Sequence, residues 1–139
     1  MKKSLTLEQM DNLIAIGVPT ENANRGYERR LLPKSGTEEI LVHPHPGHPD
    51  YEWSEWKPTK FYRKWENNDR VQSRPSFNIE NMIELLPKTV DVNFTLLITR
   101  ERDGSWRARY CTMLYAEADE LLDALYKLYI LCHEQNKLK

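Results

Sequence analysis

The chain lacks long hydrophobic runs. Its longest uninterrupted apolar stretches cover four or five residues, whereas a membrane-spanning helix needs about 18 or more. The N-terminal segment MKKSLTLEQMDN contains two lysines, but no apolar segment follows them as a secretory signal peptide requires. We therefore expect a cytoplasmic protein that does not enter a membrane.

Cysteine is scarce. The chain has two, Cys111 and Cys132, which lie far apart in apolar surroundings and form no CxxC pattern. Small secreted domains use many cysteines as a disulfide framework, whereas cytosolic proteins keep their thiols reduced. We expect two buried, reduced thiols and no disulfide.

An excess of charge of either sign is also absent. The sequence has 20 Lys and Arg against 21 Asp and Glu, so no field over the whole surface attracts nucleic acid or an acidic partner. A hydrophobic content of 40% and a charged content of 29% are typical of a soluble globular protein. The length of 139 residues predicts a single domain over residues 1–139.

Recognisable catalytic motifs are missing, because the chain contains no Gly-rich phosphate loop, no GxSxG and no HExxH. Cys132 and His133 are neighbours in sequence, but adjacent side chains on a helix point about 100° apart. Adjacency alone therefore predicts no catalytic dyad. We expect no enzymatic activity and no cofactor.

What the chain does have is a strong helical pattern near its C-terminus, in residues 116–134. Its apolar residues recur at the i, i+3, i+4, i+7 spacing of a helix packed on a core. Its first turns are acidic, which suits the partly positive N-terminus of a helix. The pattern predicts a long C-terminal helix with one apolar stripe, formed by Ala118, Leu121, Leu122, Leu125, Leu128, Tyr129 and Cys132.

A shorter helix of about ten residues is predicted near the N-terminus. Thr6 and Gln9 have the spacing of a capping box, and Leu5 and Met10 have that of a hydrophobic staple. Gly17 is typical of the end of a helix. The expected buried face consists of Leu7, Met10, Leu13 and Ile14.

A further helix is predicted over Phe77–Leu86, with Asn78 as its N-cap. Phe77 and Met82 fit the staple positions of this helix. Pro87 ends it, because the residue before a proline avoids helical geometry. The expected apolar face consists of Ile79, Met82, Ile83 and Leu86.

Residues 93–115 have the pattern of a β-hairpin that turns at Asp103-Gly104. A three-residue loop, 102–104, with a positive φ at Gly104 brings the apolar residues together on one face. It pairs Ile98 with Ala108, Leu96 with Tyr110, Phe94 with Thr112, and Arg100 with Trp106 in a cation–π contact. The expected fold is α+β: a small antiparallel sheet with helices packed on one face, among them the long C-terminal helix.

The middle of the chain gives weaker signals. Residues 18–34 have turn chemistry and no periodicity, Glu39–Val42 fits a short strand, and 66–74 fits an exposed connection. The aromatic segment Tyr51–Trp65 is divided by Pro58 into two pieces that form either edge strands or an ordered loop.

Several of these stretches resemble a known group. LTLEQMDNLIAIGVPTENA, FNIENMIELLPK and EADELLDALYKLYILCHE are similar to segments of a group of small uncharacterised proteins of gut-associated bacteria and their phages or prophages. The matching positions are helix caps, core residues and a Leu-Pro-Lys helix stop, so the resemblance implies a fold and a phage- or mobile-element origin. It supplies no activity and no functional residues, and the central segment does not match the group.

Three histidines in the central segment form a candidate metal site. His43, His45 and His48 are followed by Asp50 and Glu52, and imidazoles on an extended loop can converge on Zn²⁺ or Ni²⁺. The intervening prolines stiffen the segment and work against convergence. A solvated Pro/His loop is the alternative.

A second candidate site is the basic and aromatic stretch of residues 57–74, where six Lys or Arg against two Asp or Glu give a local charge of +4. Cations beside aromatic side chains suit a single-stranded nucleic acid or another partner. The alternative reading puts the aromatics in the core and leaves the cations solvated. The candidate residues are Lys60, Phe61, Tyr62, Arg63, Lys64 and Trp65.

The expected function is that of a non-catalytic accessory or interaction protein, phage- or mobile-element-derived, that acts by binding another macromolecule. Another protein is the first expected partner. A nucleic-acid binder that uses residues 56–74 is the alternative, and a metal-binding protein built on His43–His48 is the second alternative. Trp53, Trp56 and Trp65 fall in no predicted helix, so a homodimer that buries them is a further hypothesis.

Overall fold

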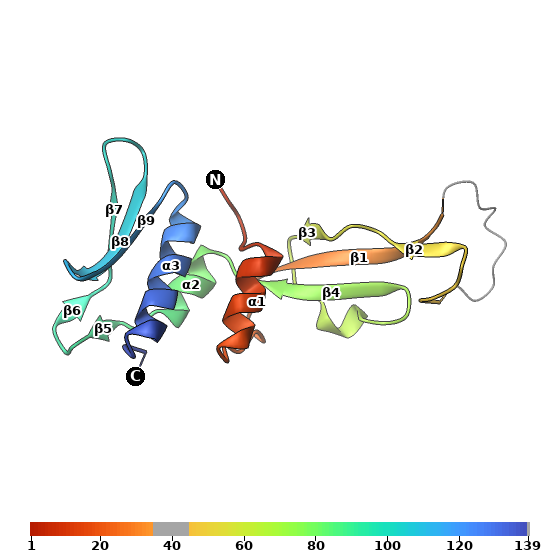
Figure 1. Cartoon of the computed structure of the whole chain (residues 1–139), viewed down its shortest axis with the longest axis horizontal. Helices are drawn as coiled ribbons and strands as arrows, with labels where there is room; N and C mark the ends of the chain where they lie inside the picture. Colours follow the sequence, from red (N-terminus) through yellow and green to blue (C-terminus); the bar gives the residue numbers. More distant parts are fainter. Residues whose placement is uncertain (35–44, 139) are drawn as a thin grey trace.

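A computed structural model describes residues 1–34 and 45–138 of the chain. The molecule is elongated, with the helices at one end and a narrow group of strands extending from them (Figure 1). We call residues 1–24 and 77–138 the head, and residues 25–34 and 45–76 the arm. The α+β class expected from the sequence is confirmed.

The head contains three helices and two small antiparallel sheets. The first sheet is the two-stranded pair β5-β6, and the second has the order β7-β8-β9. The long helix α3 packs on β8 and β9, and α2 packs beside α3. The elements are α1 (Leu7–Ala15), α2 (Ile79–Leu85), α3 (Leu121–Glu134), β5 (Thr89–Val90), β6 (Phe94–Thr95), β7 (Leu97–Arg100), β8 (Trp106–Cys111) and β9 (Leu114–Ala118).

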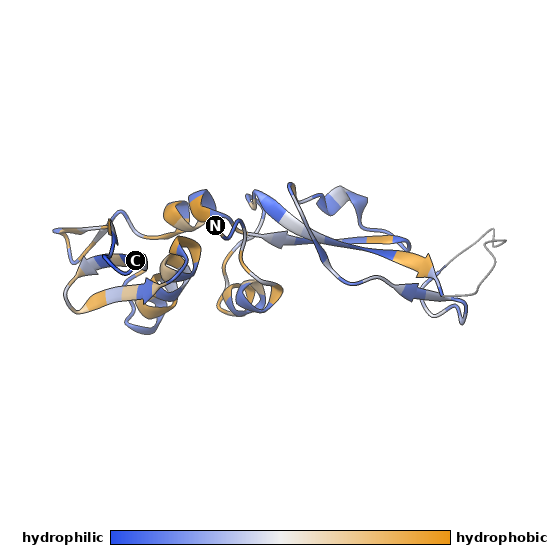
Figure 2. Cartoon of the chain, turned by 90° about the horizontal axis from the view of Figure 1, so that it is seen from above, coloured by the Kyte–Doolittle hydropathy of each residue, from blue (hydrophilic) through white to orange (hydrophobic). Residues whose placement is uncertain are grey.

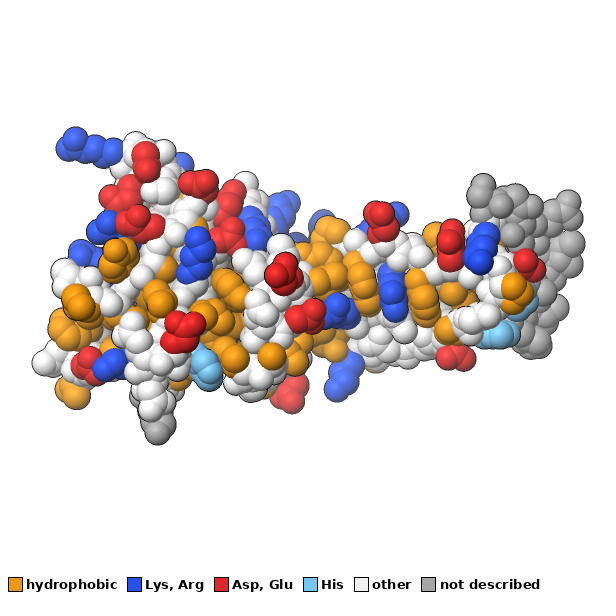
Figure 3. Space-filling model, viewed as in Figure 1, with side chains coloured by type: hydrophobic (Ala, Val, Ile, Leu, Met, Phe, Trp, Pro, Cys, Tyr) orange, Lys and Arg blue, Asp and Glu red, His pale blue; other side chains and the backbone are white. Residues whose placement is uncertain are grey.

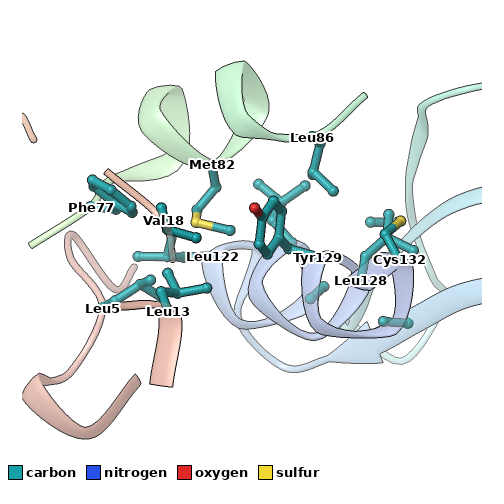
Figure 4. Packing of buried hydrophobic residues seen from close by; sticks show 14 of the residues in the cluster. Leu5, Leu13, Val18, Phe77, Met82, Leu86, Leu122, Leu128, Tyr129 and Cys132 are labelled. Carbon is teal, nitrogen blue, oxygen red and sulfur yellow. The ribbon is translucent and has the colours of Figure 1, made fainter. Parts of the chain in front are cut away.

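The hydrophobic core lies in the head, between the three helices and the β7-β8-β9 sheet. Figure 4 shows Leu5, Leu13 and Val18 meeting Phe77 and Met82 at one end of this cluster. The cluster continues along α3 through its buried residues Leu122, Ala124, Leu125, Leu128, Tyr129 and Cys132. Most of the apolar stripe predicted for the C-terminal helix therefore holds the head together.

The predicted start of α1 is confirmed. The backbone N–H of Gln9 donates to Thr6 Oγ1 at 3.1 Å, and the backbone N–H of Thr6 donates to Gln9 Oε1 at 2.9 Å. At the other end Gly17 has a φ of +94°, a conformation that glycine adopts without strain. One part of the prediction is wrong: Ile14 is exposed, because α1 meets the core mainly through Met10 and Leu13.

The predicted start of α2 is also confirmed, since Asn78 caps the helix in a reciprocal pair with Asn81. Phe77 and Met82, at the staple positions, are both buried. Ile83 is exposed, so the expected apolar face is wrong at this position. Asn81 takes its place in the interior, where it binds the backbone of the loop that follows α1.

The hairpin register is confirmed at its centre, where Ile98 pairs with Ala108 and Arg100 with Trp106. Gly104 has the expected positive φ, at +90°. The guanidinium carbon of Arg100 lies 5.1 Å from the ring centroid of Trp106. The pair of Phe94 with Thr112 is wrong, because Phe94 pairs instead with Val90. Leu96 lies just before β7, whose first residue, Leu97, pairs with Arg109 in the predicted register. A turn at Asp91 and Val92, both with positive φ, draws Phe94 away into the separate sheet.

The predicted C-terminal helix begins too early. Residues 114–118 form strand β9, and the helix starts at Leu121 with Glu120 as its N-cap. Leu114 and Ala116 are buried while Tyr115 and Glu117 are exposed, which is the alternation of a strand packed on one face. The carboxylate of Glu117 therefore accepts from Arg107 Nε on β8 at 2.7 Å and does not lie in the first turn of α3.

The arm corrects part of the expectation for residues 18–34 and 66–74, because 25–33 and 71–74 lie in strands, whereas 18–24 and 67–70 belong to no helix or strand. Its central strand β1 (Arg25–Pro33) pairs along one edge with β4 (Val71–Ser76) and along the other with β2 (Tyr51–Trp53) and β3 (Lys57–Thr59). The first piece of the aromatic segment thus contains the edge strand β2, and a second edge strand, β3, runs through Pro58. The rest of the second piece, after Thr59, is an ordered loop that ends in a 3-10 helix. The strand expected at Glu39–Val42 lies outside the described residues.

Candidate functional site

The arm has no hydrophobic core of its own. Among its described residues the only large buried side chain is Tyr51. Figure 2 shows most of the arm in hydrophilic or neutral colours, apart from the far end of β1, whereas apolar residues gather in the head. Ten Lys and Arg against six Asp and Glu give residues 25–34 and 45–76 a charge of +4. The arm is therefore a basic element within a chain of nearly zero net charge.

Stacking of arginine on tryptophan takes the place of a core in the arm. The guanidinium carbon of Arg29 lies 4.8 Å from the ring centroid of Trp53 and 4.7 Å from that of Trp56. Arg29 Nε also donates to Gln72 Oε1 on β4 at 2.7 Å. Arg74 stacks on Trp56 at 5.5 Å. Figure 3 shows hydrophobic and basic side chains alternating along one face of the arm.

These contacts bear on the homodimer hypothesis for the tryptophans. Trp53 and Trp56 have stacking partners within one chain, so neither needs a second copy to cover it. Trp65 is different, because its side chain is 80% exposed. It lies in the short 3-10 helix η1 (Lys64–Glu66) between β3 and β4.

The segment 60–65, predicted as a partner surface, follows β3 and passes close to β1 at Gly26. A Cβ at position 26 would lie 3.0 Å from the carbonyl oxygen of Arg74 and 3.1 Å from that of Phe61. The Phe61 carbonyl also accepts from Thr59 Oγ1 at 2.8 Å. Glycine at position 26 therefore allows the segment to lie directly against the strand.

Side chains of this segment are presented to solvent. Phe61 is 63% exposed, so the alternative reading that placed the aromatics in the core is wrong for Phe61 and for Trp65. Tyr62 is half-buried, and its burial raises the pKa of its hydroxyl. Lys60 and Lys64 are exposed, and Arg63 forms an ion pair with Glu66 at 3.0 Å.

A basic groove lies where the arm joins the head. It consists of two adjoining open concavities that share Lys3, Arg25 and Lys60 in their walls. Phe61 and Tyr62 line the first concavity, together with Glu80 from α2. We call this site the base groove. Of its cations only Lys60 was predicted, because Lys3 and Arg25 lie far from it in sequence and no local pattern joins the three.

The histidine candidate is described only in part, since His43 lies outside the described residues. The rings of His45 and His48 are 5.3 Å apart and stand edge to face. The backbone N–H of Asp50 donates to His48 Nδ1 at 3.1 Å, so this hydrogen bond competes with a metal for Nδ1 but not for Nε2. Within residues 1–34 and 45–138 no three His, Cys, Asp or Glu side chains form a group able to hold a metal ion. The site that includes His43 stays a prediction.

The two cysteines are free thiols. Cys132 is buried, and burial raises the pKa of its thiol to about 11. His133 is exposed, so the two neighbours lie on different sides of α3, as the helical geometry predicted. Cys132 is therefore held as a neutral thiol in the core, out of reach of the adjacent imidazole.

Comparison with known proteins gives no relative for this chain. No family model, no curated protein and no solved structure matches it. Among the helices of the described part, none combines the length and apolar character needed to cross a membrane.

Proposed function

We propose that this protein is a non-catalytic accessory protein that acts by binding another macromolecule, and that the arm carries its binding surface. The observation that carries the proposal is the exposure of two large aromatic side chains, Phe61 and Trp65, on a basic element without a core. Aromatic side chains exposed in this way are typical anchors of interfaces.

The construction of the arm supports this proposal. Its strands are joined by pairing along both edges of β1 and by the stack of Trp53, Arg29 and Trp56. The backbone of segment 60–65 is tied to these strands, because Thr59 Oγ1 donates to the carbonyl of Phe61 at 2.8 Å and the backbone N–H of Arg63 donates to Ser73 Oγ at 3.3 Å. The side chains of Phe61 and Trp65 stay exposed. Ordered aromatics lose little conformational entropy when a partner binds, which favours affinity.

The burial of the Cys132 thiol supports a non-catalytic role. A thiolate is the reactive form of cysteine, and burial keeps Cys132 protonated at neutral pH. The resemblance to proteins of gut-associated bacteria and their phages supports a phage- or mobile-element origin. Together with the two free thiols, it is consistent with a cytoplasmic site of action.

Affinity capture with matched variants tests the proposal. The immobilised protein is incubated with lysate of a gut-associated bacterium, and the bound material is quantified after nuclease treatment, after protease treatment and without either. We expect wild type to retain a macromolecule that the double variant Phe61→Ala/Trp65→Ala does not retain. The control is Val92→Ala/Met113→Ala, which removes side chains that are 86% and 83% exposed in the head.

Unchanged thermal unfolding of both variants is a precondition for the comparison, and exposed substitutions of this kind usually change stability little. The proposal is contradicted if the arm variant and the control retain the same material in the same amounts.

A further inference from the structure

The base groove brings together three positive charges from separate parts of the chain. Lys3 comes from the N-terminal segment, Arg25 from the start of β1, and Lys60 from the segment after β3. None of the three forms an ion pair with another described residue. One carboxylate, that of Glu80, also lines the groove, so three cations against one acidic side chain leave an excess of positive charge. An anion in the groove gains interaction energy from this excess.

An aromatic surface stands beside these charges. Phe61 lines the same groove as Lys60 and is 63% exposed. Its backbone is fixed by the hydrogen bond from Thr59 and by the close approach to Gly26. An exposed ring on a backbone held in this way offers a platform on which a nucleic-acid base can stack.

Together these features point to a ligand with both phosphates and exposed bases. We infer that the base groove binds a single-stranded nucleic acid, with phosphates against Lys3, Arg25 and Lys60 and a base stacked on Phe61. This inference rests on the proposed function and names the class of macromolecule that the arm binds.

The shape of the groove distinguishes the candidate ligands. Both concavities are open to solvent, and small-molecule sites bury most of their ligand, so a free nucleotide would make only part of the contacts that a strand makes. In a duplex the base faces are covered by their neighbours, whereas a single strand presents them to aromatic side chains.

The charge around the groove also favours a polymer. Lys57 lies three residues before Lys60 on the edge strand β3, and its side chain is exposed. Because each phosphate contact releases a counterion, a strand that follows these cations binds with a strong dependence on salt. Because the net charge of the whole chain is near zero, this attraction is local to the base groove and the arm.

Fluorescence anisotropy with labelled oligonucleotides tests the inference. The probes are single-stranded DNA and RNA of about 12 nucleotides, a length within the range that small domains cover, with the corresponding DNA duplex and poly-glutamate as competitors. Titrations at several salt concentrations give the affinity and the slope of log K against log salt. Each phosphate of a single strand that the protein neutralises contributes about 0.7 to the magnitude of this slope.

The variants Phe61→Ala and Lys60→Ala are expected to separate the contribution of base stacking from that of phosphate contacts. Phe61→Ala lowers affinity by about tenfold or more and leaves the salt slope unchanged, because it removes stacking but no charge. Lys60→Ala reduces the magnitude of the slope by about 0.7. The matched controls are Met113→Ala, an exposed apolar truncation in the head, and Lys88→Ala, an exposed lysine in the head. Both controls bind like wild type, and unfolding curves establish that all four variants are folded.

The inference is overturned if no oligonucleotide binds at low salt, or if Phe61→Ala and Lys60→Ala weaken binding no more than their controls. It is also overturned if the duplex or poly-glutamate displaces the labelled oligonucleotide as effectively as an unlabelled single strand does. If no oligonucleotide binds but the arm still retains a protein from nuclease-treated lysate in the capture experiment, the inferred ligand class is wrong and the proposed function stands. If both experiments fail, the proposed function falls as well.

Discussion

The guanidinium carbon of Arg29 lies 4.7 Å from the ring centroid of Trp56. This contact joins the central strand β1 to the segment between the edge strands β2 and β3. The arm has no apolar interior in this region. With Trp53 also stacked against it, Arg29 connects parts of the chain that would otherwise be held only by backbone pairing. The position of the proposed binding surface therefore depends on a stack of side chains outside the core.

Removing this guanidinium is expected to loosen the arm. Arg29→Ala removes two stacking interactions, each worth about 0.5–1 kcal/mol at an exposed site, and one hydrogen bond worth about 1 kcal/mol. We predict that hydrogen exchange of the β1 and β4 amides accelerates by roughly 30- to 100-fold, while exchange in α3 does not change. The control is Arg30→Ala, whose side chain pairs with Glu28 on the opposite face of β1. Equal exchange rates in the two variants would contradict the role of the stack.

Gly26 is expected to tolerate no side chain. In Gly26→Ala the new Cβ meets the backbone oxygens of Arg74 and Phe61 at 3.0 and 3.1 Å, and such overpacking costs about 1–3 kcal/mol. The segment that carries Phe61 must move away, so trypsin should cleave after Lys60 about tenfold faster. Gly47→Ala, in the turn before β2, strains the backbone without a clash and serves as the control. Cleavage at the wild-type rate in Gly26→Ala would show that the close contact does not hold this segment.

Asn81 is expected to stabilise the junction between head and arm. Its Oδ1 accepts from the backbone N–H of Asn24 at 2.9 Å, and its Nδ2 donates to the carbonyl of Asn22 at 2.8 Å. Asn81→Ala removes these two partly buried hydrogen bonds, each worth about 1 kcal/mol, and should lower the free energy of unfolding by about 1–2 kcal/mol.

Urea denaturation of this variant should give a lower midpoint with an unchanged m-value. Glu84→Ala, at an exposed position of the same helix, should change the midpoint little, and Asn81→Asp should fall between the two because it keeps the acceptor. A decrease in Asn81→Ala no larger than that of Glu84→Ala would contradict the proposed role.

The stability of the head is expected to fall at alkaline pH. Burial raises the pKa of the Cys132 thiol from 9.0 to about 11, so the folded state keeps a proton that the unfolded state has already released. The stabilisation is complete below pH 9 and disappears as the pH rises through about 11, with a magnitude on the order of 2 kcal/mol. Burial also raises the pKa of Tyr110 and of Tyr129. Both hydroxyls therefore add to the loss of folding stability as the pH rises.

Urea titrations across this range check the prediction, with Cys132→Ala as the comparison. The variant lowers stability at every pH because it leaves a small cavity, but its decrease between pH 9 and 11 should be smaller. An equally steep decrease in wild type and variant would show that Cys132 does not contribute to it.

Local signals in the sequence predicted the head well. The capping pair of Thr6 and Gln9 and the glycine of the β7-β8 loop act over a few residues, and both were confirmed. The error at Ala116–Ala118 arose because these residues satisfy both a helical spacing with α3 and the alternation of a strand. Pairing with β8, which places Ala116 opposite Ala108, decides between the two.

The arm could not be predicted in the same way. Strand recognition relies on one buried face, and β1 has a single buried residue, Gly26. Its pairing with β4 joins residues more than 40 positions apart, such as Arg29 and Gln72. The aromatic and basic segment was found as a site because its residues are contiguous, whereas the base groove depends on chain segments that only folding brings together.

Site-specific photo-crosslinking tests the central claim, that the arm is the binding element, most directly. A photoreactive benzophenone analogue of phenylalanine replaces Phe61 in one sample and Met113 in the other, two exposed positions on the arm and on the head. After irradiation in lysate, with nuclease and protease digestion to classify each product, we predict discrete adducts from position 61 that are absent from position 113. The same adducts from both positions, or adducts from position 113 alone, would contradict binding through the arm.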